Sequence, residues 1–232
     1  MNIMYNYLVS LAISFGKGLL LGSSVYLIGW CMDRTISKSS LEITMKKDEE
    51  TYKIGEEYII NNLLVISPIT YAIIDNTVLS HELAFSIFPF LGLILIQNIS
   101  YFVIHREMHR NKKLFWIHKF HHKYDNITIP SIANAVTYYE FILAYISPMI
   151  IGAYFIKPTE LEFLSAISII SLLNLLIHTY ELNNVKWCSG LVSPTHHIEH
   201  HKERNVHYAA PLLNVDEYMY YVSEYILKKN KN

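Results

Sequence analysis

Apolar residues along this chain gather into five long runs that are separated by polar segments. The runs span residues 5–31, 58–79, 83–104, 138–156 and 161–177. Each run has close to the twenty residues that an α-helix needs to cross a ~30 Å hydrocarbon core. The pattern therefore predicts an all-α fold, a multi-span transmembrane helical bundle.

The composition supports a membrane protein. Hydrophobic residues make up 52% of the chain and charged residues 17%, and the mean hydropathy is +0.22. The net charge of −1 gives no electrostatic reason to expect a nucleic-acid partner. Cys31 and Cys188 are the two cysteines of the chain, which excludes a disulfide framework and a CxxC redox or zinc pair.

The basic residues predict which side of the membrane each polar segment faces. Alternating spans place residues 32–56, a solvated loop or surface helix, on the same side as residues 105–125 and everything after the fifth run. That side carries 17 of the 19 lysines and arginines, and Lys17 and Lys157 are the remaining two. By the positive-inside tendency, it is the cytosolic side.

Histidine is concentrated directly after the third apolar run, where five of the twelve histidines fall within eighteen residues. Their spacings are Hx3H and Hx2HH, and on a helix such offsets place the side chains of each set on one face. A second Hx2HH follows near the C-terminus, and His178 ends the fifth run. The hairpin of the fourth and fifth runs returns His178 to the side of the first two sets. We therefore expect a cytosolic, histidine-rich helical cap on the bundle.

Nine histidines are the candidate metal ligands. Neutral imidazole suits zinc, iron, copper and nickel, so the ligand type leaves the metal open. A closed tetrahedral site takes four ligands, and nine are therefore enough for two metals with open positions. A zinc-protease helix needs Glu directly after the first His, whereas Glu107 is the second residue after it. The nine are His105, His109, His118, His121, His122, His178, His197, His200 and His201.

These sets, in this order, resemble the fatty acid hydroxylase / sterol desaturase superfamily of integral-membrane di-iron oxygenases. The resemblance covers about residues 97–216: HRxxH at 105–109, HxxHH at 118–122, the isolated His178, and HxxHH at 197–201. The sequence also departs from the family pattern, and the departures leave the subfamily and the substrate open. They are Asn98 for an acidic residue, His207-Tyr208-Ala209 for Asn-Tyr-Gly, Val215 for Trp, and Glu140 as the one residue kept of His-Pro-x-Glu.

The resemblance implies that two iron ions (Fe2+), bound by the nine histidines, use O2 to hydroxylate or desaturate a lipid of sterol, sphingolipid or fatty-acyl type. It implies an external electron donor, such as a b-type cytochrome with its reductase, and an endoplasmic reticulum location if the source is eukaryotic. No catalytic residue beyond the metal ligands and no organic cofactor are expected. Five further residues are candidates for additional ligands or for hydrogen-bond partners of ligands. They are His196, His207, Glu107, Glu199 and Asn174.

We expect three regions in the chain. Residues 1–81 carry N-terminal membrane segments and a cytosolic loop, residues 82–220 form the histidine-box catalytic domain, and residues 221–232 are a basic tail. Two other functions stay open at this point, a metal-handling protein for transport or storage and a non-catalytic relative of the same fold. Transport predicts histidines spread along a path through the bilayer, whereas the enzyme reading requires the clusters to converge.

Overall fold

The computed structural model describes residues 2–125 and 127–229, which are largely helical with no β-strand among them. The all-α prediction is thus confirmed. The α-helices are α1 (Asn2–Thr35), α2 (Lys38–Lys47), α3 (Glu49–Asn61), α4 (Ser67–Thr77), α5 (Ile87–Arg110), α6 (Phe115–His118), α7 (Tyr138–Glu140), α8 (Ser147–Ile156), α9 (Glu160–Ile177), α10 (Pro194–Glu203) and α11 (Val215–Lys229). Shorter turns are η1 (Asn62–Ile66), η2 (His121–Lys123), η3 (Pro130–Asn134), η4 (Phe141–Ile146) and η5 (Tyr180–Leu182).

Five helices of the described chain are long and apolar enough to cross a membrane, as an integral membrane protein requires. Two of them are composite. The span Glu49–Thr77 joins α3 to α4 through η1, and the span Tyr138–Ile156 joins α7 to α8 through η4. Both connecting turns are π-helical and lie just before a proline, Pro68 or Pro148. A proline lacks an N–H and its ring crowds the carbonyl four residues earlier, and the wider turn relieves that conflict without ending the helix.

The polar segment 32–56 is helical in the structure and supplies α2 and the first half of α3. Of the two alternatives expected there, a solvated loop or a surface helix, the structure shows the helix. Asp48 begins α3 by accepting a hydrogen bond from the backbone N–H of Thr51 at 2.9 Å. Glu49 and Glu50 occupy the first turn, where the helix dipole favours negative charge. The charge run therefore starts a helix that continues into the membrane span.

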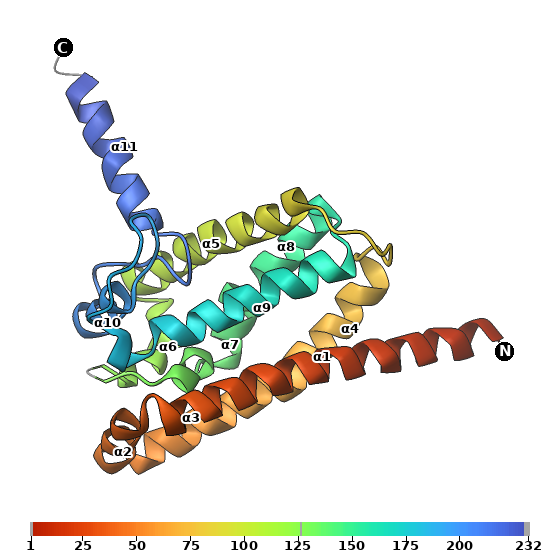
Figure 1. Cartoon of the computed structure of the whole chain (residues 1–232), viewed down its shortest axis with the longest axis horizontal. Helices are drawn as coiled ribbons and strands as arrows, with labels where there is room; N and C mark the ends of the chain where they lie inside the picture. The colour runs from red at the N-terminus through yellow and green to blue at the C-terminus, as the bar shows by residue number, and fades with distance from the viewer. Residues whose placement is uncertain (1, 126, 230–232) are drawn as a thin grey trace.

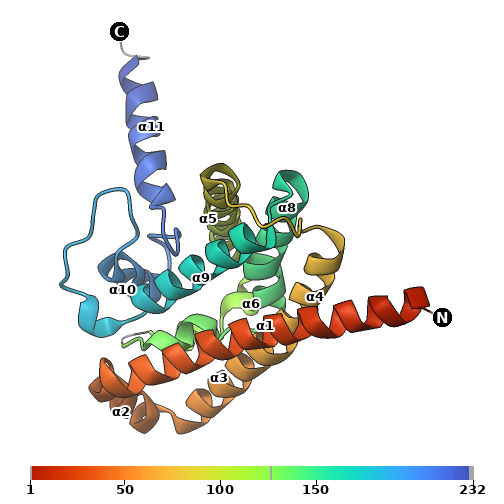
Figure 2. The same ribbon diagram turned by 45° about the vertical axis from the view of Figure 1, so that its right-hand side comes forward.

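The bundle has two sides with α9 between them (Figures 1 and 2). On one side α1 packs along α4 and η1, and on the other α5 packs on α8 and α9. Figure 1 shows α6, α10 and the loops around them gathered at one end of the bundle, with the N-terminus at the other. α11 projects away from this cap and runs across the 220/221 boundary expected from the sequence, while residues 230–232 lie outside the described residues.

An ion-pair network joins three spans at the end far from the cap. Lys17 on α1 lies 2.6 Å from Glu160 on α9 and 3.8 Å from Asp75 on α4. The buried Asp75 also accepts a hydrogen bond from Ser14 at 2.6 Å. His81 lies at this end, with Nδ1 3.8 Å from Asp75. A lysine inside an apolar run is tolerated here because it faces protein carboxylates rather than lipid.

A glycine allows the closest contact between α1 and the second span. A Cβ built on Gly22 would lie 2.0 Å from the carbonyl oxygen of Leu63, whereas one built on Gly16 meets nothing within 4 Å. We expect Gly22→Ala to lower the free energy of unfolding by about 1–3 kcal/mol, the usual cost of overpacking. Thermal unfolding in detergent measures it. Gly16→Ala, on the same helix, should be neutral or stabilising, and equal unfolding temperatures for the two variants would contradict the close packing.

Candidate metal centre

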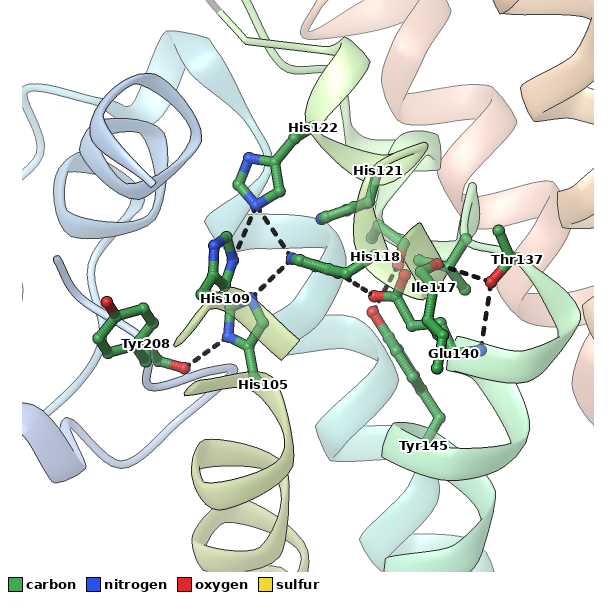
Figure 3. Close-up of polar contacts among 12 residues, drawn as sticks. His105, His109, Ile117, His118, His121, His122, Thr137, Glu140, Tyr145 and Tyr208 are labelled. Carbon is green, nitrogen blue, oxygen red and sulfur yellow. Dashed lines mark hydrogen bonds and ion pairs between the residues drawn. The ribbon is translucent and has the colours of Figure 1, made fainter. Parts of the chain in front are cut away.

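All nine candidate ligands converge at the capped end of the bundle, as the enzyme reading requires. They come from the end of α5, from α6 and η2, from the residue that ends α9, and from α10. Eight of the nine are buried and His109 is half-buried. Figure 3 shows the imidazoles of the first two sets turned toward one another. Segments separated by more than seventy residues therefore build one site.

The nine imidazoles form two adjacent groups, and in each group the ligand nitrogens lie within 4.8 Å of one another. The five-histidine group contains His105, His109, His118, His122 and His200. The four-histidine group contains His121, His178, His197 and His201. The arrangement offers two ions one site each, and no carboxylate belongs to either group of the described residues.

The partition does not follow the histidine sets of the sequence, so the expectation of one shared face per set is wrong for the second and third sets. α6 ends at His118 and a 3-10 turn begins at His121. His118 and His122, four residues apart, share the five-histidine group, whereas His121 joins the four-histidine group. On α10, adjacent residues point about 100° apart. His200 and His201 consequently also join different groups.

Hydrogen bonds at the outer ring nitrogens fix how two imidazoles of the five-histidine group are protonated. His105 Nδ1 lies 2.7 Å from the carbonyl oxygen of Tyr208, and His118 Nδ1 lies 2.6 Å from Oε1 of Glu140 (Figure 3). A carbonyl or carboxylate only accepts, so each Nδ1 carries the proton and each Nε2 a bare lone pair. Yet the two Nε2 atoms are 2.9 Å apart. Lone pairs facing each other at this distance repel, and a cation between them removes the repulsion.

The remaining nitrogen distances in this group match ligands that share one ion. His122 Nε2 lies 2.9 Å from His118 Nε2 and 3.1 Å from His109 Nε2. With a metal–nitrogen bond of about 2.1 Å, ligands 90° apart are separated by about 3.0 Å and tetrahedral ligands by about 3.4 Å. His200 donates its Nδ1 proton to the carbonyl of Val206 at 2.7 Å, and its Nε2 is buried without a partner. The group therefore fits a transition-metal ion.

The four-histidine group repeats the arrangement. His178 donates its Nδ1 proton to the carbonyl of Asn174 at 2.7 Å, which leaves its Nε2 bare. That Nε2 lies 2.8 Å from Nε2 of His197 and 3.3 Å from Nε2 of His121. His201 Nε2 lies 3.3 Å from His197 Nε2. These distances also fit ligands of one ion.

Burial keeps the imidazoles of the cap uncharged. It holds the pKa of His118, His121, His197, His200 and His201 well below the ordinary value, and the neighbouring imidazoles add to this effect. It lowers the pKa of His178 to about 4. Metal ligation requires the neutral ring, so the site is ready to bind metal at neutral pH without first losing protons.

Four of the five further candidates make no polar contact with the nine imidazoles among the described residues. His196 and His207 stack on each other with ring centroids 4.9 Å apart. His207 Nε2 lies 3.2 Å from Glu199, which is 53% exposed, and Glu107 is also exposed. Asn174 does contact a ligand, but through its backbone carbonyl. Its side chain donates to the carbonyl of Ala133 at 3.3 Å instead.

Sequence reasoning did not single out Glu140 as a site residue. Its side chain is 1% exposed and bonds His118, as Figure 3 shows. Thr137 caps the helix that carries Glu140 and donates to the carbonyl of Ile117 at 2.8 Å, which ties this helix to the residue before His118. The available signal was a lone acidic residue at the start of an apolar run, because a buried carboxylate requires a partner. The carbonyls of Tyr208 and Val206 also bond candidate ligands, but a backbone contact does not depend on residue type and so cannot be predicted from the sequence.

Comparisons with known proteins agree with this geometry. A sequence model of the fatty acid hydroxylase family matches residues 90–220, more than half of the chain. No curated protein and no solved structure matches the chain. The match includes every histidine of the two groups and implies a hydroxylase-type oxidoreductase. The chain therefore belongs to the fatty acid hydroxylase family, within the fatty acid hydroxylase / sterol desaturase superfamily.

Proposed function

We propose that this protein is a membrane-bound di-iron oxygenase that hydroxylates or desaturates a lipid. The observation that carries the proposal is the pair of buried histidine groups whose bare Nε2 atoms face one another at the end of the bundle. Donor sets of neutral imidazole suit iron among other transition metals, and family membership favours iron. We place one Fe2+ in each group.

Two ferrous ions would supply the activation of O2. The protein's own residues position and protect them. Backbone carbonyls hold His105, His178 and His200, and a carboxylate holds His118, each in the tautomer that directs Nε2 inward. Burial of the imidazoles excludes water from the site. Hydroxylation then converts R–H, O2, two electrons and two protons into R–OH and water, and desaturation removes two hydrogens from the lipid and gives two waters.

The substrate in this proposal is a sterol, sphingolipid or fatty-acyl lipid that enters from the bilayer. The two electrons come from an external donor, such as a b-type cytochrome with its reductase, that approaches the cap. The distribution of basic residues supports a cytosolic cap, and in a eukaryotic source the membrane is that of the endoplasmic reticulum. Histidines gathered at one end support an enzyme over a metal transporter, which needs a polar path along the bundle.

Lipid analysis of a host that expresses the chain tests the proposal. We expect wild-type protein to generate lipids shifted by one oxygen or by the loss of two hydrogens, and to purify with about two irons per chain, one for each group. His118→Ala and His121→Ala, one from each group, should abolish the new lipids. His81→Ala, at the far end of the bundle, should leave them unchanged. A single zinc, no iron and no oxidised lipid would contradict the proposal.

A further inference from the structure

Gln97 is a polar residue without a partner inside the membrane-spanning bundle. It lies on α5, eight residues before His105, which is about 12 Å along a helix. The residue is 2% exposed, and its Oε1 atom is buried with no hydrogen-bond partner among the described residues. Burying an amide without a hydrogen bond lowers the stability of the fold, so we expect a bound molecule to supply the missing bond.

The side chain of Gln97 lines a partly open cavity of about 120 Å3, whose wall also includes residues of α1, η1, α4, η3, η4, α8 and α9. A water needs only ~10–15 Å3 on this measure, so the cavity has room for a segment of a lipid. Its lining is largely apolar. Half-buried lining residues Leu21 and Ser171 directly adjoin Leu20 and Leu172, which are 71% and 45% exposed on the lipid-facing surface. Two of the helices that wall the cavity, α1 and α9, are therefore exposed on another face, where lipid would meet them.

The other end of the cavity approaches the metal centre. Tyr145 lines the cavity, and Figure 3 shows its ring beside the pair of Glu140 and His118. The ring of Tyr145 also packs on that of Tyr101, with centroids 5.6 Å apart. The ring of Tyr101 in turn packs on that of His105, with centroids 5.1 Å apart. The rings of Tyr145 and Tyr101 thus lie between a ligand in the cavity and His105 of the five-histidine group.

Three hydroxyls of the cavity wall already have partners in the protein. The hydroxyl of Tyr145 donates to the carbonyl of Ala133 at 3.0 Å, that of Tyr71 to Glu160 at 2.8 Å, and that of Ser67 to a backbone carbonyl at 2.9 Å. Among the described residues, Gln97 is the one lining residue with a buried side-chain atom that lacks a partner.

We propose that the cavity binds the apolar part of a neutral lipid alcohol, and that the amide of Gln97 bonds its hydroxyl. A hydroxyl donates to the amide oxygen and accepts from the amide nitrogen, so it suits either orientation of the side chain. A carboxylate or phosphate would stay unpaired, because no lysine, arginine or histidine of the described chain lines the cavity. The identification of this alcohol as the substrate rests on the proposed function. Gln97 would then hold the hydroxyl about 12 Å along α5 from His105, a residue of the five-histidine group.

Dodecanol and dodecane test the hydroxyl preference, added to detergent micelles of the purified full chain at equal mole fraction. We expect wild-type protein to bind dodecanol at least about tenfold more tightly than dodecane, as measured by equilibrium binding and by the rise in unfolding temperature. In Gln97→Leu the two ligands should bind within about twofold of each other. His81→Ala, which changes a residue outside the cavity lining, should keep the wild-type preference.

Equal binding of both ligands by wild-type protein would overturn the inference without any variant, so it remains testable if Gln97→Leu does not fold. If Gln97→Leu still prefers dodecanol to dodecane, the inference is also overturned, because the amide of Gln97 then does not bond the alcohol. The proposed function is tested separately by iron content and lipid oxidation. A preference for dodecanol without lipid oxidation would contradict the proposed function and support the alcohol site. Lipid oxidation without that preference would support the proposed function and contradict the alcohol site.

Discussion

Replacing His200 by alanine is expected to cost the protein the metal of the five-histidine group, whereas replacing the adjacent His201 should cost it the metal of the four-histidine group. Each variant should purify with about half of the wild-type iron and form no oxidised lipid. The physical reason is that neighbouring residues on α10 point about 100° apart and so serve different ions. Metal content and lipid products measure both effects.

Double variants identify which ion is lost. His109 and His200 share a group, so His109→Ala combined with His200→Ala should retain as much iron as either single variant. His200→Ala combined with His201→Ala should lose both ions. His196→Ala is the matched control, since His196 is on the same helix and contacts none of the nine imidazoles by a polar bond. Equal iron content in the two double variants would contradict the partition.

Glu140→Ala is expected to weaken metal retention and lipid oxidation by about 10–100-fold, although Glu140 belongs to neither histidine group. Without the carboxylate, the Nδ1 proton of His118 has no acceptor at 2.6 Å, and nothing holds its Nε2 toward the other ligands. Glu140→Gln should be milder because the amide oxygen still accepts that proton. Iron retained against increasing chelator concentration is the measurement.

The control for this variant is Glu199→Ala. Glu199 lies on α10 among the ligands but is exposed, and its side chain contacts His207 rather than one of the nine imidazoles. Its removal should leave chelator resistance unchanged. If Glu140→Ala holds iron as firmly as Glu199→Ala does, the bond to His118 has no part in positioning the metal.

One membrane span contributes residues both to the metal centre and to the cavity. Glu140 and Tyr145 share the composite span Tyr138–Ile156, whose π-helical turn lies between the cavity and the cap. π-helical turns often mark functional positions in helices. One span therefore carries both the residue that orients a candidate ligand and a residue that borders the lipid cavity.

Sequence alone determined the membrane bundle and the convergence of the histidine sets. Run length fixes whether a helix can cross the bilayer, and the alternation of runs brings His105, His178 and His201 to one side. These inferences depend on distances along the chain and on hydrophobicity, which the sequence states directly. The family pattern then added a chemistry to the expected cluster.

Tertiary structure alone decided how the imidazoles divide and what holds them. The spacing of residues 118–122 does not say which ion each imidazole serves, and the structure places His121 and His122 in separate groups. The bond from Glu140 to His118 and the isolation of Gln97 depend on helices that pack across the bundle. Such contacts join residues whose separation in the chain says nothing about their distance, so only the packed structure determines them.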